Sequence, residues 1–232
     1  MNVTAIVPAF NEQQTIADVV SGLRPVVSAV LLIDDGSRDA TAVLASAAGA
    51  EVIRHATNRG LGAAITTGIA AALARGADVI VTFDADGQMD PRDVPRLLAT
   101  LQVTSYELRV PTTPSIAIGS RWLQSRRPLT RYCANLAANI FTYLLFGVWS
   151  TDTQSGLRAF TRAAAEKLEL HPHAPPGMEV SSEIFAEIAR LKLHFVEIPI
   201  QPRYTDYSKS KGQNFFVGLA TLGRLFLRRL TR

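Results

Sequence analysis

The sequence predicts an α/β protein in which a mostly parallel β-sheet is flanked by helices on both sides. Short β-rich apolar runs alternate with segments whose apolar residues recur at helical spacing through the first half of the chain. The run DVIVTF at residues 78–83 is nearly continuous in apolar residues, as in a strand that is buried on both faces. Strand–helix alternation of this kind favours a parallel sheet with two helical layers.

The composition fits one domain that spans residues 1–232. At 25.1 kDa the chain is long enough to bury a large core, and no linker divides it. The one cysteine, Cys133, excludes an intrachain disulfide and favours a reducing compartment. We expect no cleaved leader, because a strand begins almost at once. We expect no membrane span, because the longest apolar stretch, residues 132–149, contains Asn135 and Asn139 and lacks about 20 uninterrupted apolar residues.

The elements of the first half follow one another closely. The predicted strands lie at residues 3–8, 29–34, 51–54 and 78–83, and the predicted helices at residues 12–23, 39–48 and 60–76. Asn11 is expected to cap the first helix while Gln14 reaches back to it, as in a capping box. Asp90 followed by Pro91 predicts the start of a further helix at residues 92–101.

The second half is less regular. Residues 102–114 break the alternation and are expected to form a surface insertion before a strand at residues 115–120. Beyond it the sequence predicts helices at 129–146 and 179–191, a loop at 151–160, a strand at 195–200 and a final helix from Gln213. We therefore divide the domain into residues 1–120, 121–212 and 213–232.

Polar side chains gather where four of the predicted strands end. These stretches are PAFNE at 8–12, DDGS at 34–37, DADGQ at 84–88 and GSR at 119–121. Ligands of an open parallel sheet bind beyond the carboxyl ends of its strands, so the four stretches are expected to meet at one edge. Any one of them alone is explained by a turn or a helix cap. Their coincidence indicates a binding site.

Three carboxylates crowd the end of the fourth predicted strand. Asp84, Asp86 and Asp90 lie within seven residues, and like charges this close destabilise a fold unless a cation or hydrogen bonds offset the repulsion. Asp84 and Asp86 can share a hard divalent ion whose remaining ligands come from a diphosphate, and Gln88 is positioned to add a neutral oxygen. We assign Asp90 to the helix cap instead.

Other glycine-rich and acidic stretches carry a weaker signal. Asp34 to Ser37 fit a turn in which Ser37 caps the next helix as well as they fit a site. Gly60 and Gly62 precede a helix N-terminus, where a phosphate could bind, but we interpret them as a tight turn. The sequence contains neither a phosphate-binding P-loop nor a dinucleotide-binding motif after its first strand.

Six stretches taken in order resemble glycosyltransferase family 2, which has the nucleotide-sugar-binding GT-A fold. They are VPAFNE, IDDGSRDAT, NRGLGAAI, FDADGQMDP, IGSRW and TDTQSGLRAF. Within the family, the chain is similar to the polyprenyl-phosphate sugar synthases from residue 3 to about residue 211. The resemblance implies transfer of a hexose, with inversion, from a nucleoside-diphosphate sugar (a GDP- or UDP-hexose) to a polyprenyl phosphate.

The resemblance also implies roles for residues that match the family's motifs. The donor would be held by Pro8, Phe10, Glu12 and Asp35 at the nucleoside, by Asp84, Ala85 and Asp86 at the diphosphate, and by Arg121 at the sugar or phosphates. Asp84, Asp86 and Gln88 would bind Mg²⁺ or Mn²⁺. The catalytic set that the resemblance implies is Asp86, Arg121, Asp152, Arg203 and Lys209.

The acceptor side rests on basic residues. Arg203 with Lys209 six residues later matches a pair in the family, although Lys211 competes for the second position. A phosphate acceptor would be bound by Arg131, Arg203 and Lys209, and as an oxyanion it needs no general base. An acceptor hydroxyl would need one, and Asp152 is the candidate.

The basic C-terminus points toward a membrane. The net charge is +4, and apolar residues and arginines of residues 213–232 fall on different faces of a helix. Such a helix either lies in a membrane interface or packs on the domain. We expect a cytoplasmic enzyme, peripheral at the inner face of the membrane, with a membrane surface or a membrane protein as partner.

Two other functions fit part of the sequence. The same donor could serve a soluble or protein-bound hydroxyl acceptor, or the chain could be an inactive nucleotide-sugar-binding or signalling domain. We expect no nucleic-acid partner, because the basic tail lacks aromatic stacking positions and zinc-ligand spacing. The four histidines are scattered, and we interpret them as structural or surface residues: His55, His171, His173 and His194.

Overall fold

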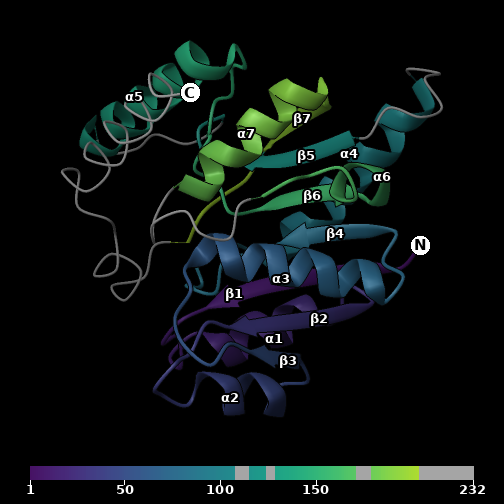
Figure 1. The fold of residues 1–232 in the computed structure, drawn as a ribbon, viewed down its shortest axis with the longest axis vertical. Helices are drawn as coiled ribbons and strands as arrows, with labels where there is room; N and C mark the ends of the chain where they lie inside the picture. The colour runs from purple at the N-terminus through teal and green to yellow at the C-terminus, as the bar shows by residue number, and fades with distance from the viewer. Residues whose placement is uncertain (108–114, 124–128, 171–178, 204–232) are drawn as a thin grey trace.

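The computed structural model describes residues 1–107, 115–123, 129–170 and 179–203, with the side chains of 102–107, 115, 129–134 and 179 left out. Figure 1 shows one sheet with helices on both of its faces. The strands are β1 (Val3–Ala9), β2 (Ala29–Asp34), β3 (Glu51–Arg54), β4 (Val79–Thr82), β5 (Ser115–Ser120), β6 (Arg158–Thr161) and β7 (His194–Pro199). The helices are α1 (Ile16–Leu23), α2 (Thr41–Ala47), α3 (Leu61–Ala74), the 3-10 turn η1 (Pro91–Asp93), α4 (Val94–Glu107), α5 (Leu129–Phe146), α6 (Arg162–Ala165) and α7 (Glu179–Leu191).

The sheet confirms the predicted fold class. Its seven strands run in the order β3-β2-β1-β4-β6-β5-β7. All neighbouring pairs are parallel except the two that involve β6, which is antiparallel to β4 and to β5. The strands β1, β2, β4, β5 and β7 therefore end at the same edge, here called the carboxyl edge, and β6 begins there.

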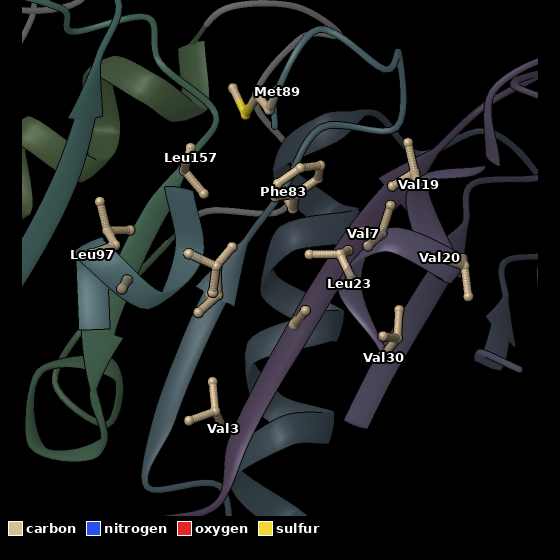
Figure 2. Packing of buried hydrophobic residues seen from close by; sticks show 14 of the residues in the cluster. Val3, Val7, Val19, Val20, Leu23, Val30, Phe83, Met89, Leu97 and Leu157 are labelled. Carbon is tan, nitrogen blue, oxygen red and sulfur yellow. The ribbon is translucent and has the colours of Figure 1, made fainter. Parts of the chain in front are cut away.

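Two cores form because successive side chains of a strand point to opposite faces. On β1, Val3, Ala5 and Val7 pack with α1, α2 and α4, whereas Ile6 packs on the other face with α3, α6 and α7. Figure 2 shows the first of these cores. The parallel sheet is thus covered on both sides, as its apolar strands predict.

The first core also fixes the loop that follows β4. Phe83, Met89 and Leu157 are buried within it, at 0%, 4% and 0% exposure (Figure 2). Burying a side chain the size of Phe83 contributes about 1.5–3 kcal/mol. Phe83 directly precedes residues 84–90, here called the acidic loop, and Met89 lies near the end of this loop, so the core holds the loop on both sides.

The capping box predicted at α1 is wrong. The N-cap residue is Thr15, with no side-chain hydrogen bond to the helix, and Asn11 has a positive φ of 55°. Asn11 instead connects two loops: its backbone N–H donates to Ser37 Oγ over 2.9 Å, and its Oδ1 accepts from the backbone N–H of Arg38 over 2.9 Å. The polar groups of Asn11 therefore make a tertiary contact and do not cap α1. Ser37 takes part in the same contact, and it does not cap α2.

Two other predicted features differ from the structure. The helix α4 continues to Glu107, so residues 102–107 are helical and are not part of an insertion; residues 108–114 lie outside the described residues. The predicted loop at 151–160 ends in the strand β6, whose four residues are too short for a period-two signal. The final helix expected from Gln213 also lies outside the described residues.

No helix in the described part of the chain is long and apolar enough to cross a membrane.

Candidate active site

The acidic loop begins one residue after β4 at the carboxyl edge. Burial raises the pKa of Asp84 to about 6, and the negative charges of Asp86 and Glu12 act in the same direction, against the attraction of Arg121 and Arg158. A carboxyl that is held near other carboxylates in this way favours a nearby cation. The five side chains therefore share one electrostatic environment, although they come from four different segments of the chain.

Asp86 is held by Gln88. The backbone N–H of Gln88 donates to Asp86 Oδ1 over 2.9 Å, and its side-chain Nε2 donates to Asp86 Oδ2 over 2.7 Å. The amide nitrogen of Gln88 thus faces the acid. In this arrangement Gln88 orients Asp86 through its two N–H donors, and the binding of a metal ion by its side-chain oxygen stays a prediction.

The rest of the loop is tied to α1 and to the segment after β7. Thr15 Oγ1 donates to the carbonyl oxygen of Ala85 over 2.7 Å. As predicted, Asp90 caps the next helical segment, accepting from the backbone N–H of Arg92, and it also pairs with Arg203 Nη2 over 2.7 Å. These two arginines, Arg92 first, lower the pKa of Asp90 to about 2.

The donor set fits Mg²⁺ or Mn²⁺. Both ions prefer oxygen ligands, and Mg²⁺ in particular keeps several water or phosphate oxygens when one or two carboxylates hold it. Among the residues that the structure describes, no three His, Cys, Asp or Glu side chains form a metal-binding group. Asp84 and Asp86 would therefore supply two carboxylates. Burial and the negative charge of Asp86 raise the pKa of Asp84, and a divalent ion would offset this charge.

Arg121 is fixed by Asp152. The backbone N–H and Nε of Arg121 donate to Asp152 Oδ2 over 3.0 and 2.7 Å, and its Nη2 donates to Oδ1 over 2.8 Å. The Asp152 side chain is 0% exposed and that of Arg121 is 20% exposed. A buried carboxylate that is held by a guanidinium is poorly placed to take a proton from an acceptor, so these contacts favour a positioning role for Asp152. Its role as general base stays a prediction.

The loop that carries Asp152 is itself anchored by three polar side chains that sequence reasoning did not place in the site, one half-buried and two buried. Glu197 of β7 accepts from the backbone N–H of Thr151 over 2.9 Å. Asn135 and Asn139 of α5 donate to the carbonyl oxygen of Thr151 over 3.0 and 2.8 Å. Two asparagines at helical spacing in an apolar segment were the available signal, because a buried amide needs partners.

Arg158 is a second cation that sequence reasoning missed. It begins β6, is 1% exposed, and its Nη2 donates to the carbonyl oxygen of Thr153 and to Ser181 Oγ over 3.0 and 3.1 Å. Burial lowers the pKa of Arg158 to about 10, although Asp84 and Asp152 attract its charge. An arginine inside the apolar run GLRAF was the signal, since a buried charge requires partners.

The residues that were predicted to hold the nucleoside differ in their exposure. Phe10 is 41% exposed at the end of β1, and Pro8 is half-buried beside it. Asp35 is buried and accepts from His55 Nδ1 over 2.7 Å and from the backbone N–H groups of Arg59 and Gly60 over 2.9 and 2.8 Å. Asp35 therefore organises the turn before α3. Its contact with a nucleoside stays a prediction, and His55 is structural, as expected.

The predicted acceptor residues are only partly described. Arg203 is 54% exposed and reaches the acidic loop through Asp90. Its backbone N–H also donates to the carbonyl oxygen of Gln88 over 2.7 Å. The side chain of Arg131 and all of Lys209 and Lys211 lie outside the described residues.

Comparison with known proteins shows the family of the chain. Residues 4–168 match the model of glycosyl transferase family 2. The chain is 33% identical to the UDP-N-acetylglucosamine–dolichyl-phosphate N-acetylglucosaminyltransferase of Methanococcus voltae, over 96% of this chain and 94% of that one. It is 30% identical to the undecaprenyl-phosphate mannosyltransferase of Micrococcus luteus, over 96% and 92%.

A solved structure gives the fold independently. The glucosyl-3-phosphoglycerate synthase of Mycobacterium tuberculosis, in complex with Mn²⁺ and uridine-diphosphate-glucose, superposes with a TM-score of 0.66. The identity is 20%, and the match covers 99% of this chain and 78% of that one, which establishes the likeness of fold. The chain therefore belongs to glycosyl transferase family 2, as a nucleotide-sugar glycosyltransferase with the GT-A fold.

Proposed function

We propose that this enzyme transfers a hexose from a nucleoside-diphosphate sugar to a polyprenyl phosphate, with inversion at the anomeric carbon and with a divalent metal ion held by Asp84 and Asp86. The carrying observation is the acidic pair at the carboxyl edge, where Arg121 and Arg158 act on Asp84. Relatives that cover nearly the whole chain are named for transfer to dolichyl or undecaprenyl phosphate, which supports the acceptor class.

On the donor side, the residues act by holding charge in place. When bound, Mg²⁺ or Mn²⁺ neutralises the negative charge that develops on the leaving diphosphate. Gln88 holds Asp86, and Asp152 holds the guanidinium of Arg121, so neither group has to reorganise during the reaction. Fixed charges in a site that excludes water stabilise a transition state more than mobile ones do. The exposed ring of Phe10 is offered to the base of the nucleoside.

On the acceptor side, the contacts of Asp152 favour a phosphate acceptor. A phosphate oxyanion is already a nucleophile at neutral pH, whereas a hydroxyl must lose its proton to a nearby base. Asp152, which the sequence suggested as the base, is buried against Arg121. We assign the acceptor phosphate to Arg203, with Arg131 and Lys209, and the guanidinium of Arg203 is sufficiently exposed to meet a second anion besides Asp90.

Helix α5 supports an acceptor that is embedded in a membrane. It buries the polar side chains of Asn135, Asn139 and Thr142. On its other side and just after it lie large exposed apolar residues: Ile140 at 43%, Tyr143 at 48%, Leu144 at 72% and Trp149 at 49%. The rings of Tyr143 and Trp149 meet edge to face with centroids 6.0 Å apart. An apolar surface with Tyr and Trp suits the boundary between lipid and water.

The test is transfer of labelled sugar from UDP- and GDP-hexoses to undecaprenyl phosphate, to undecaprenol and to soluble phosphate acceptors. We expect product on the polyprenyl phosphate alone, only with Mg²⁺ or Mn²⁺, and none with Asp86→Asn. The control is Asp18→Asn, which removes an exposed carboxylate in the first turn of α1 and should keep full activity. Transfer to undecaprenol but not to its phosphate would contradict the acceptor class. Donor binding without any transfer would indicate a sugar-nucleotide sensor.

A further inference from the structure

Gly156 lies directly opposite Asp84. The antiparallel register of β4 and β6 pairs Val79 with Thr161 and Thr82 with Arg158. Both pairs of residue numbers sum to 240, so the same register continued past the strand ends pairs Asp84 with Gly156. Thr82 Oγ1 donates to the carbonyl oxygen of Gly156 over 2.7 Å, which confirms that the two segments remain in contact there.

The carboxylate of Asp84 fills the space that a side chain at Gly156 would need. A Cβ placed on Gly156 would lie 2.0 Å from Asp84 Oδ1 and 2.2 Å from its Cγ and Oδ2. The backbone of Gly156 is not in the left-handed region, unlike that of Gly147 with φ of +72°. The conformation of the chain therefore does not require glycine at position 156. The position of the Asp84 carboxylate does.

Arg158 adds an electrostatic reason for the same position. Its guanidinium is buried two residues further along, and its Nε has no hydrogen-bond partner in the part of the chain that the structure describes. Its charge attracts the carboxylate of Asp84. Asp84 is thus drawn toward the start of β6 by a charge and has room there because residue 156 has no side chain.

We propose that Gly156 is a positioning residue for the metal: the free space over its Cα holds the Asp84 carboxylate in the rotamer that binds the divalent ion beside Asp86. This inference rests on the proposed role of the acidic pair. Its consequence is specific. The Asp84 side chain is short and can turn about its Cα–Cβ bond, so a methyl group at position 156 moves the carboxylate away while the fold survives.

The experiment is a titration of the purified 232-residue chain with Mn²⁺, with and without UDP. The electron paramagnetic resonance signal of the free ion measures how much Mn²⁺ remains unbound. For Gly156→Ala we expect the dissociation constant for Mn²⁺ to rise by roughly 10- to 100-fold, the range found when groups that orient metal ligands are altered. Asp84→Asn should show a loss at least as large. The melting temperature of the metal-free Gly156→Ala protein should stay within a few degrees of wild type.

The matched control is Gly68→Ala in α3. Its Cβ would meet the side chains of Ile6 and Ile33 at 3.0 to 3.2 Å, so it strains the second core without contact to the acidic loop. It should bind Mn²⁺ as wild type does. If Gly156→Ala also binds Mn²⁺ like wild type, the positioning role is wrong although the metal site stands. If wild type itself binds no Mn²⁺ with or without UDP, the metal site and the positioning role fall together.

A second measurement decides the case in which Gly156→Ala is strongly destabilised. The same substitution is then made in an Asp84→Ala background, where the colliding carboxylate is absent. In a double-mutant cycle most of the stability cost should disappear, because the two residues interact directly. An undiminished cost in that background would show that position 156 does not act through Asp84, and would overturn the proposal.

Discussion

The carboxyl group of Asp84 connects stability to pH at the scale of one residue. Burial and the charge of Asp86 raise its pKa from 3.8 to about 6, so the folded state binds this proton more tightly than the unfolded state does. Stability consequently falls as the pH rises from about 4 to about 6, and the full cost of the charge is present above that range.

Asp84→Asn should therefore stabilise the metal-free protein while it weakens metal binding. We expect the free energy of unfolding at pH 7.5 to rise on the order of 1–3 kcal/mol, and the gain to shrink toward zero near pH 4. Urea denaturation at both pH values, with EDTA present, measures it. Equal or lower stability of Asp84→Asn at pH 7.5 would show that the acidic loop carries no such electrostatic cost.

Asp152 distinguishes a positioning residue from a general base. Breaking a buried ion pair by removing one charge costs about 3–5 kcal/mol, so Asp152→Asn should lower the free energy of unfolding by about that amount. If Asp152 holds Arg121, the pH dependence of kcat should keep its shape in this variant. A variant of unchanged stability whose pH–rate profile loses its acidic limb would instead identify Asp152 as the base.

The sequence indicated some of these residues and missed others for a physical reason. Asp84, Asp86 and Arg121 directly follow apolar strands, so local pattern was enough to place them at the carboxyl edge, where the structure has them. Gly156 and Glu197 matter only through partners that lie at least 46 residues away in the chain. No local pattern reports such contacts, since they depend on which strands become neighbours.

At the scale of elements, α5 has its polarity reversed relative to an ordinary surface helix. Over residues 135–146, its buried amides hold the loop of Asp152, and Ile140, Tyr143 and Leu144 are exposed. The apolar spacing predicted the bounds 129–146 correctly, because this spacing does not depend on which side of the helix faces the protein. Which side faces outward was not predictable without the loop that the asparagines bind.

The exposed side of α5 should bind lipid. Burial of a leucine side chain contributes about 1.5–3 kcal/mol, so Leu144→Glu should weaken binding to anionic vesicles by roughly tenfold or more. Val43→Glu is the control, because Val43 is equally exposed, at 71% against 72%, but lies on α2. Co-sedimentation with vesicles measures both. Equal binding of the two variants would exclude α5 from the membrane contact, and removal of residues 213–232 tests the predicted C-terminal helix in the same assay.

At the scale of the whole molecule, β6 joins the two predicted halves. It belongs to residues 121–212 but lies between β4 and β5, which belong to residues 1–120. The alternation of strands and helices predicted the parallel part of the sheet. It did not predict that β6 lies between β4 and β5, because an antiparallel strand of four residues that follows a long connection has no sequence pattern of its own. The segment that leads into β6 returns the chain to the carboxyl edge and places Asp152 and Gly156 there.

A shared sheet should unfold as one unit, so the single-domain prediction can be tested directly. Trp122 and Trp149 both lie in the second half, whereas circular dichroism also reports on α1, α2, α3 and α4 of the first half. We expect urea transitions followed by tryptophan fluorescence and by circular dichroism to coincide, as in a two-state domain. Separate midpoints would mean that the halves are independent despite β6.

The central claim is that a divalent ion joins Asp84 and Asp86 to the diphosphate of the donor. Calorimetric titration of UDP- and GDP-hexoses into the native chain and into Asp86→Asn, with Mn²⁺ and with EDTA, tests it most directly. We predict binding of one nucleotide sugar that requires Mn²⁺ and is lost in Asp86→Asn. Equal affinity in EDTA, or full affinity of the variant with Mn²⁺, would contradict it.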